Sequence, residues 1–212
     1  MANGHFSPLT EIERDALGEV SNIAMARAAH SLRQMVGYEV LLSVPSVEIL
    51  TQEAAGSIVT GSRNPNLVAV RQDFTGAFSG RALLIFPVTT SLELVRVVVG
   101  GQLPLEDIVH LEDEALAETG NIILNSWVAA AANLLKLSLK MSLPVVMRGG
   151  SNRIFKNLEI SDDLVLFLHI EFEVRHVQIS GYVALIMDIP SLGTLRALIA
   201  DFIASFSKPG GE

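Results

Sequence analysis

A glutamate and an asparagine recur with one spacing in both halves of the 212-residue sequence. Glu19 stands three positions before Asn22, and Glu118 stands three positions before Asn121. A carboxylate can pair with a cation, and an amide can donate and accept hydrogen bonds without carrying a charge. Such a pair could therefore recognise a polar or cationic partner. A single Glu-x-x-Asn most often belongs to a solvated helix face, because glutamate favours both helices and water.

Repetition argues against plain solvation for these two pairs. Asparagine is a poor residue for the interior of a helix, because its amide competes for backbone hydrogen bonds. Each asparagine is also followed by a proline 23 positions later, Pro45 in the first half and Pro144 in the second. Two asparagines at equivalent positions with the same surroundings indicate a shared function.

Both pairs lie on segments with helical periodicity. At about 100° per residue, the polar side chains of each segment fall on one stripe of a helix. The stripe consists of Asp15, Glu19 and Asn22 in the first segment and of Glu114, Glu118 and Asn121 in the second. The apolar residues on the opposite side are predicted to face the core: Leu17, Val20, Ala24, Ala28 and Met35 in the first segment, and Leu116 and Ile123 in the second.

These helices open the two copies of a longer internal duplication. The residues around the two asparagines match at an offset of 99, and Ser79-Gly80 matches Ser180-Gly181 at an offset of 101. A period of about 100 residues is too long for a solenoid and indicates two copies of one half-domain. We expect one fused domain over residues 1–212, because no linker rich in Pro, Gly or Ser separates the copies. The repeats are expected at about 9–100 and 107–206, followed by a disordered tail at 207–212.

Each half has the same predicted order of elements, a long helix, several strands and a closing helix. In the first half we expect a helix from Thr10 to Gly37, strands over Tyr38–Leu50, Leu67–Gln72 and Ala77–Phe86, and a helix over Ser91–Val99. In the second half we expect a helix over Glu112–Leu139, strands over Leu143–Met147, Leu164–Phe172 and Val177–Met187, and a helix over Ser191–Ser207.

Local signals support this order. Thr10 and Glu13 have the spacing of a capping box, Gly37 suits the end of a helix, and Pro45 suits an edge strand or a bulge. Strands within a half follow one another without a helix between them, and the turn at Thr75-Gly76 would join one such pair. The sequence therefore predicts an α/β (α+β) fold, a single pseudo-twofold domain from two tandem half-domains with a mostly antiparallel sheet packed against long helices.

The composition excludes several classes of protein. Half of the residues (50%) are hydrophobic and 18% are charged, which excludes a disordered chain. The most apolar segment, Ile122–Leu135, is interrupted by polar residues and is too short to span a membrane. The net charge is −8 and no cluster of Lys or Arg occurs, so we expect no nucleic-acid partner and no membrane insertion.

Cysteine and histidine usage excludes common catalytic and metal sites. The chain has no cysteine, so it has no disulfides, thiolate metal sites or cysteine nucleophiles. Its five histidines show no paired metal-binding spacing, and Gly149-Gly150 lacks the lysine of a phosphate-binding loop. The segment Met1–Phe6 has neither a basic nor an apolar signal region, and we expect a cytoplasmic location.

With these residues in place, the sequence resembles the CheC/CheX/FliY family of chemotaxis phosphatases. The family signature is Asp or Ser, three residues, Glu, two residues, Asn, twenty-two residues and Pro. Asp15, Glu19, Asn22 and Pro45 match it completely, whereas Glu114 stands in the second half where the signature has Asp or Ser. Two signatures without a switch-type C-terminal domain are most similar to the CheC type. The resemblance extends over nearly the whole chain.

The resemblance implies an aspartyl-phosphate phosphatase that acts on a response regulator such as phosphorylated CheY. The regulator supplies the Mg²⁺, a lysine and the acyl phosphate, so no cofactor or metal of the protein's own is expected. Asn22 and Asn121 would hold the attacking water in line, as the glutamine of GTPases does. Glu19 and Glu118 would pair with the regulator's lysine. Asp15 and Glu114 would have accessory roles; Asp15 could instead complement the helix dipole.

Two other functions remain open at this stage. The protein could be a non-catalytic adaptor that binds a phosphorylated regulator or the receptor deamidase CheD, which family members also bind. A small-ligand sensor is less favoured, because no interior polar cluster is evident. A phosphatase needs each glutamate and asparagine exposed, with space beside the asparagine. Ala26 and Ala29 leave that space in the first half, whereas Asn125 leaves less in the second. Trp127 is predicted to belong to the core.

Overall fold

The computed structural model describes residues 9–61, 66–99, 105–155, 164–174 and 176–207. The Gly100-Gly101 junction, the segment Met1–Phe6 and all of the expected disordered tail except Ser207 lie outside these ranges. The predictions made for those residues therefore stay predictions.

The first helix, α1 (Glu11–Val36), begins and ends at the predicted residues. Thr10 accepts a hydrogen bond from the backbone of Glu13, and the Glu13 side chain bonds back to the backbone of Thr10, which completes the capping box. Gly37 ends the helix with φ 74°, a left-handed conformation that favours glycine. The local capping signals alone therefore locate this 26-residue helix.

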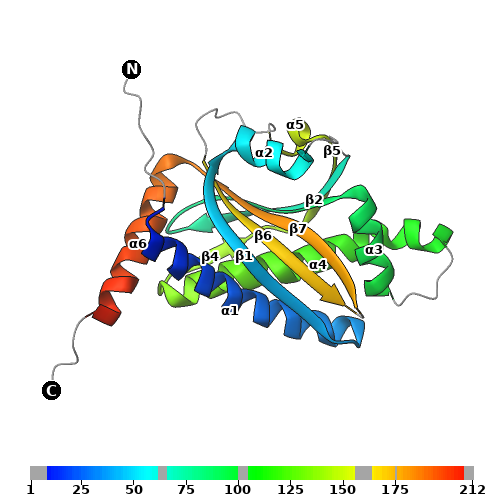
Figure 1. Cartoon of the computed structure of the whole chain (residues 1–212), viewed down its shortest axis with the longest axis horizontal. Coiled ribbons are helices and arrows are strands. Elements are labelled where there is room, and N and C mark those ends of the chain that lie inside the picture. Colours follow the sequence, from blue (N-terminus) through cyan, green and yellow to red (C-terminus); the bar gives the residue numbers. More distant parts are fainter. Residues whose placement is uncertain (1–8, 62–65, 100–104, 156–163, 175, 208–212) are drawn as a thin grey trace.

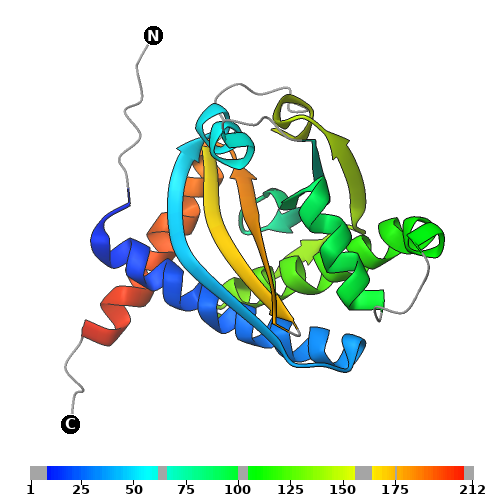
Figure 2. The ribbon, with the colours of Figure 1, turned by 45° about the vertical axis from the view of Figure 1, so that its right-hand side comes forward.

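A seven-stranded sheet, antiparallel in every pair, forms the centre of the molecule (Figures 1 and 2). Its order is β1-β6-β7-β3-β2, and β4 and β5 both pair with β2. The strands are β1 (Val40–Thr51), β2 (Leu67–Gly76), β3 (Gly80–Pro87), β4 (Leu139–Met141), β5 (Val145–Gly149), β6 (Leu164–Val174) and β7 (Val177–Met187). The predicted mixed fold with a mostly antiparallel sheet is confirmed.

The sheet interleaves strands from the two halves of the chain. The first strand of the first half, β1, pairs with β6 of the second half. In the same way, β4 and β5 of the second half pair with β2 of the first. The central pair, β3 with β7, also joins the halves. Each half thus completes the sheet of the other.

Helices cover both faces of this sheet (Figures 1 and 2). The larger core cluster lies between the sheet and α1, α3 (Val88–Val99), α4 (Leu105–Leu134) and α6 (Ile189–Ser207). The smaller cluster lies on the other face, under the short helices α2 (Gln52–Thr60) and α5 (Ser151–Phe155). Alternate residues of β2 face the two clusters, with Val68 and Val70 toward α4 and Leu67 and Ala69 toward α2 and α5.

The short helices α2 and α5 correct the prediction that strands follow one another directly within each half. Thr51 caps α2 by accepting a hydrogen bond from the backbone of Ala54, but this helix has only nine residues and contains Gly56, so its periodicity is weak. α5 begins at Ser151, directly after Gly149-Gly150, and has only five residues.

Tertiary pairing explains a second difference from the expected strand bounds. β2 continues through Gly76 instead of turning at Thr75, because its last three residues pair with β4. The turn to β3 lies at Ala77–Ser79 instead. The strand expected at Leu143–Met147 lies two residues later, as β5, and β4 is an additional strand that was not predicted.

The long helix α4 begins earlier and ends earlier than predicted, over Leu105–Leu134 rather than Glu112–Leu139. Its end is a Schellman-type cap, in which Leu137 donates to Ala132 and Lys136 donates to Asn133. Lys136 has φ 54° there, a position where a sequence usually has glycine. Because the residue is lysine and not glycine, the sequence contains no local signal for the end of α4.

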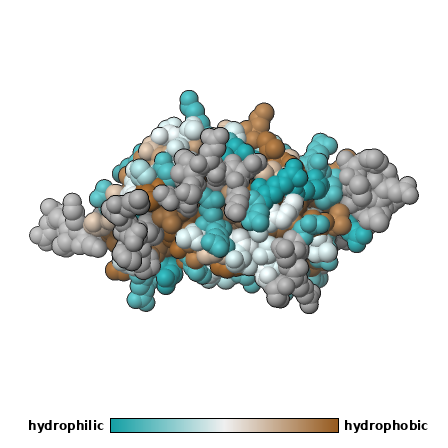
Figure 3. Space-filling view, turned by 90° about the horizontal axis from the view of Figure 1, so that it is seen from above, coloured by the Kyte–Doolittle hydropathy of each residue, from teal (hydrophilic) through white to brown (hydrophobic). Residues whose placement is uncertain are grey.

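The predicted core faces of the two long helices are confirmed except at one residue. Leu17, Val20, Ala24, Ala28, Leu116 and Ile123 are all buried. Met35 is exposed instead, whereas Leu32 and Val36 supply the buried contacts of the last turns of α1. Within the described ranges, no helix is both long and apolar enough to cross a membrane. A view from the side of α2 and α5 shows polar and apolar side chains interspersed (Figure 3).

Candidate functional site

All four signature residues of the first half line one pocket of about 610 Å³ between α1 and β1. We call Asp15, Glu19, Asn22 and Pro45 the first site. The α1 side of the pocket also has Arg14 and Gly18, and the β1 side has Val44, Ser46, Val47 and Glu48. The sequence analysis did not single out Arg14, Ser46 or Glu48. The pocket therefore presents charges of both signs around the asparagine.

A bulge in β1 shapes this pocket. Ser43 pairs with Glu171 whereas Ser46 pairs with His169, so β1 has one extra residue at this point. Pro45 lies in the bulge, where it has no N–H to leave unpaired, and β1 is the edge strand of the sheet. The predicted edge or bulge position of Pro45 is therefore confirmed on both counts.

The bulge also frees a backbone donor for the asparagine. Val44 has no partner in the β1–β6 register, and its N–H donates to Oδ1 of Asn22 at 3.1 Å. An amide oxygen can accept two hydrogen bonds. Val44 is the one donor to this oxygen recorded among the described residues, so a second acceptor position stays open. Asp15, Glu19 and Asn22 are all exposed, as the phosphatase hypothesis requires.

The second site, which we define as Glu114, Glu118, Asn121 and Pro144, has a bulge of the same size. Met141 pairs with Phe74 and Val145 pairs with Arg71, so the segment that contains Pro144 has one extra residue. Glu114 and Glu118 are exposed, but Asn121 is half-buried. Leu143, just before the proline, is 85% exposed, whereas the corresponding Val44 of the first site is 7% exposed.

Two side chains hold the amide oxygen of Asn121. Gln72 Nε2 donates to Asn121 Oδ1 at 3.1 Å, and Asn125 Nδ2 donates to the same oxygen at 2.7 Å. Asn125 also donates to the backbone oxygen of Asn121 at 2.7 Å. Gln72 in turn donates to the backbone oxygen of Ser142 at 2.8 Å. The structure thus places Asn125 beside Asn121, where the sequence analysis expected less space.

Gln72 is the residue that sequence reasoning missed at this site. It is 1% exposed and lies on the face of β2 toward α4, between the buried Val70 and Phe74. A polar residue in this otherwise apolar alternation was an available signal. Close helix packing brings it within reach, because a Cβ on Gly120 of α4 would lie 2.5 Å from Val70.

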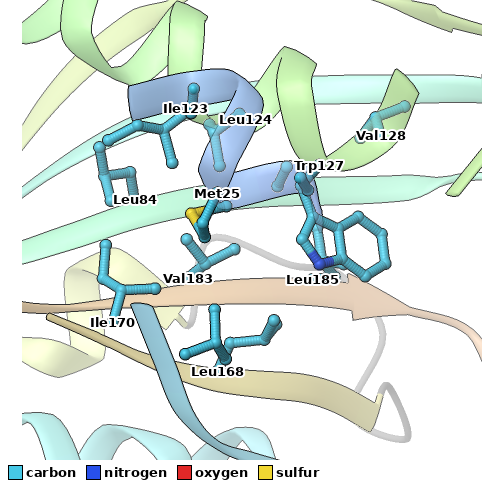
Figure 4. Packing of buried hydrophobic residues seen from close by; sticks show 14 of the residues in the cluster. Met25, Leu84, Ile123, Leu124, Trp127, Val128, Leu168, Ile170, Val183 and Leu185 are labelled. Atoms are coloured by element: carbon cyan, nitrogen blue, oxygen red, sulfur yellow. The ribbon is translucent and has the colours of Figure 1, made fainter. Parts of the chain in front are cut away.

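A buried hydrogen bond joins the two site helices behind the asparagines. Trp127 of α4 donates through Nε1 to Oγ of Ser21 at 3.0 Å, and Ser21 donates to the backbone oxygen of Leu17 at 2.6 Å. Trp127 is 2% exposed, which confirms its predicted place in the core, where it packs near Met25 and Leu185 (Figure 4). Ser21 directly precedes Asn22, so this contact fixes α1 against α4 at the first site.

Ion pairs hold both site helices against neighbouring elements. Glu13 of α1 accepts two hydrogen bonds from Arg196 of α6, at 3.0 and 2.9 Å. The Arg196 contact is the largest influence on Glu13 and lowers the pKa of its carboxyl below the ordinary value, against the opposing effect of burial. In the second half, Arg148 contacts Glu112 at 3.2 Å and Asp113 at 2.6 Å.

Strand β2 has a further charged group beside the second site. Asp73 accepts hydrogen bonds from Arg71 and Arg81, which lower the pKa of its carboxyl, Arg71 most strongly. The backbone of Asp73 also exchanges hydrogen bonds with Ser142, which holds the Ser142–Pro144 segment against β2. Within the described residues, no three His, Asp or Glu side chains are grouped to hold a metal ion.

Comparison with known proteins gives relatives in sequence. No protein-family model matches the chain. The CheY-P phosphatase CheC of Bacillus subtilis is 28% identical over 144 residues, which are 66% of this chain and 68% of that protein. The flagellar motor switch phosphatase FliY of Bacillus subtilis is 26% identical over 142 residues, which are 65% of this chain and 36% of that protein. The chain therefore spans about a third of FliY.

Solved structures share the fold. Thermotoga maritima FliY superposes with a TM-score of 0.73 at 20% identity, over 92% of this chain and 98% of that one. The FliM middle domain from H. pylori superposes with a TM-score of 0.58 at 9% identity, over 90% of this chain and 99% of that one. Identities this low establish only that the fold is shared.

Proposed function

We propose that this chain accelerates hydrolysis of the aspartyl-phosphate of a CheY-type response regulator, because two of its sequence relatives, CheC and FliY, are named phosphatases and its fold is shared with FliY. The observation that supports this most directly is the pocket that gathers Asp15, Glu19, Asn22 and Pro45. The two named phosphatases among the relatives make regulator dephosphorylation the favoured use of that pocket.

The geometry suits a reaction that needs only an oriented water. In the proposal, the regulator contributes the phosphoryl group, its Mg²⁺ and a lysine, and this chain contributes Asn22. The Asn22 amide accepts a hydrogen bond from the attacking water at the open position of Oδ1. Its Nδ2 group remains available as a donor. The amide adds no negative charge beside the phosphate. The backbone N–H of Val44 fixes the orientation of this amide in advance, which limits the reorganisation needed for attack.

Glu19 has the matching role of positioning the regulator. It lies one helical turn before Asn22 on the same exposed face and lines the same pocket. A charge-assisted contact with the regulator's lysine would set the register between the two proteins. Asp15 lies a further turn away at the pocket and has the accessory role. In the second site, Glu118 and Glu114 are proposed to act as Glu19 and Asp15 do.

A double substitution tests the proposal. Asn22→Ala combined with Asn121→Ala should abolish stimulated phosphate release from a CheY-type regulator phosphorylated with acetyl phosphate in the presence of Mg²⁺. Asn133→Ala, at an exposed asparagine of α4 away from both sites, is the matched control and should keep full activity. Full acceleration by the folded double variant would overturn the assignment of the asparagines.

The second candidate is an adaptor that binds a phosphorylated regulator, or CheD, without hydrolysing phosphate. The half-buried amide of Asn121, whose oxygen already accepts from two side chains, favours it for the second site. The same assay separates the two functions. An adaptor would bind the phosphorylated regulator and leave its rate of phosphate release unchanged.

A further inference from the structure

We infer that turnover belongs to the first site, and that Gln72 and Asn125 are positioning residues that restrain the second site by occupying the amide oxygen of Asn121. The inference rests on the proposed phosphatase function and specifies which of its two sites performs it. Glu-x-x-Asn and the proline occur in both halves, so they cannot distinguish the two sites. The difference must come from residues outside the signature.

The amide oxygen of Asn121 already accepts as many hydrogen bonds as it has lone pairs. An amide oxygen has two lone pairs, and those of Asn121 accept from Gln72 at 3.1 Å and from Asn125 at 2.7 Å. A water that is to attack phosphorus must donate one of its protons to an acceptor while its own lone pair faces the phosphorus. At Asn121 such a water must first displace one of the two donors, whereas at Asn22 the second lone pair is open.

A relay of hydrogen bonds fixes this arrangement. The backbone oxygen of Ser142 accepts from Nε2 of Gln72, so the NH₂ end of the Gln72 amide is held toward Ser142 and Asn121. Turning the amide around would lose both of these hydrogen bonds. Gln72 is 1% exposed, so bulk water does not compensate the loss. Oε1 of Gln72 is itself buried without a hydrogen-bond partner among the described residues, which shows that the donor end determines its orientation.

The first site lacks both restraining side chains. Asn125 lies four residues after Asn121 and donates back to it, and the residue four positions after Asn22 is the exposed Ala26. On β6, the strand that pairs with β1, the alternate residues on the side of the larger core cluster are all apolar: Leu166, Leu168, Ile170, Phe172 and Val174. The pocket at the first site agrees with this, since it leaves room for a partner's group next to Asn22.

Substitution of the residue four positions after each asparagine, Asn125 or Ala26, tests the inference. In an Asn22→Ala background, where only the second site can act, Asn125→Ala should raise the maximal rate of stimulated phosphate release about fivefold, the equivalent of one displaced hydrogen bond. In an Asn121→Ala background, Ala26→Asn should lower the rate of the first site by a similar factor. Gln72→Leu in the Asn22→Ala background is the second releasing variant and should also raise the rate.

Three readouts separate a positioning role from structural damage. The probe is the CheY-type regulator phosphorylated with acetyl phosphate, and its beryllofluoride-loaded form measures affinity without turnover. When Asn125→Ala, Gln72→Leu or Ala26→Asn is added to its background, the affinity for the regulator and the thermal midpoint of unfolding should change little. Only kcat should rise or fall. A gain in kcat cannot come from damage to the fold.

The outcomes distinguish the inference from the function on which it rests. Failure of the unsubstituted protein to accelerate phosphate release from any CheY-type regulator would contradict the proposed function. If that protein is active, but Asn22→Ala keeps most of the activity, or Asn125→Ala and Gln72→Leu both fail to raise the rate in the Asn22→Ala background, the inference is wrong while the function stands.

Discussion

The two sites share a signature, a bulge and a long helix, yet they present their asparagines differently. Asn22 is exposed at a pocket and accepts one hydrogen bond from a backbone N–H. Asn121 is half-buried and accepts two from side chains. The difference arises from Asn125 and Gln72, neither of which is part of the signature. A short motif therefore sets where a side chain lies, whereas its neighbours determine which of its hydrogen-bonding positions remain available.

The surfaces around the two sites differ as well. The residues beside Pro45 are the buried Val44 and the exposed Ser46, whereas those beside Pro144 are Leu143 and Val145, 85% and 56% exposed. The exposed residue beside the first proline is thus polar, whereas both exposed residues beside the second proline are apolar. A regulator that docks on both sites meets two different surfaces, which makes equal affinity for the two unexpected.

The largest expected effect separates the two asparagines. Asn22→Ala alone should lower stimulated phosphate release about 30-fold, whereas Asn121→Ala alone should lower it by less than about twofold. The reason is that a preorganised amide with an open oxygen contributes far more at the reacting centre than one whose oxygen is already occupied. Initial rates at saturating phosphorylated regulator measure the difference. Equal losses from the two single variants would remove the functional asymmetry of the sites.

A smaller effect is expected from the glutamates. Glu19→Gln should lower kcat/KM for the phosphorylated regulator about tenfold through KM, since it removes one charge-assisted contact but keeps the side chain's shape. Glu118→Gln should change kcat/KM by less than about twofold if turnover takes place at the first site. Glu11→Gln, in the exposed first turn of α1 and outside the pocket, is the control. A fall in kcat instead of a rise in KM would argue against a positioning role for Glu19.

The smallest effect concerns the anchor of the first site helix and its dependence on pH. Arg196 lowers the pKa of Glu13 below 4.5, so the folded protein binds this proton less tightly than the unfolded chain does. The stabilisation is therefore present above about pH 4.5 and is lost as pH falls through the lowered pKa. Glu13→Gln should reduce the free energy of unfolding at pH 7, and the reduction should shrink toward pH 3.

Denaturant unfolding at several pH values checks this last prediction. The second site helix gives the comparison, because Arg148 has two carboxylate partners there, Glu112 and Asp113. Removal of either partner leaves the other in place, so a single substitution should cost less than Glu13→Gln does. A Glu13→Gln effect that stays constant with pH would contradict the ion-pair explanation.

The parts of the fold that the sequence predicts are those with strong local chemistry. The capping box at Thr10, the glycine at position 37 and the bulge at Pro45 each depend on one residue type that suits one backbone geometry. The end of α4 at Lys136 and the continuation of β2 through Gly76 depend on tertiary contacts instead, and local patterns do not report those contacts. α2 and α5 are too short for a clear periodicity.

The candidate site divides in the same way. Helical periodicity alone places Asp15, Glu19 and Asn22 on one exposed face, and the repeat supplies their counterparts in the second half. The contact between Gln72 and Asn121 joins residues 49 positions apart and needs the pairing of β2 with β4 and β5. No pattern along α4 contains that information.

The interleaved sheet has a consequence for how the chain acquires its structure. β1, at Val40–Thr51, pairs with β6, at Leu164–Val174, so its partner in the folded sheet is synthesised more than a hundred residues later. At about 5–20 residues per second, this strand waits for several seconds on the ribosome with its edge unpaired. Pairing then requires closure of a long loop, and such non-local contacts slow folding. The first site, whose pocket is formed by β1 and α1, is therefore expected to become complete only after the second half of the chain has emerged.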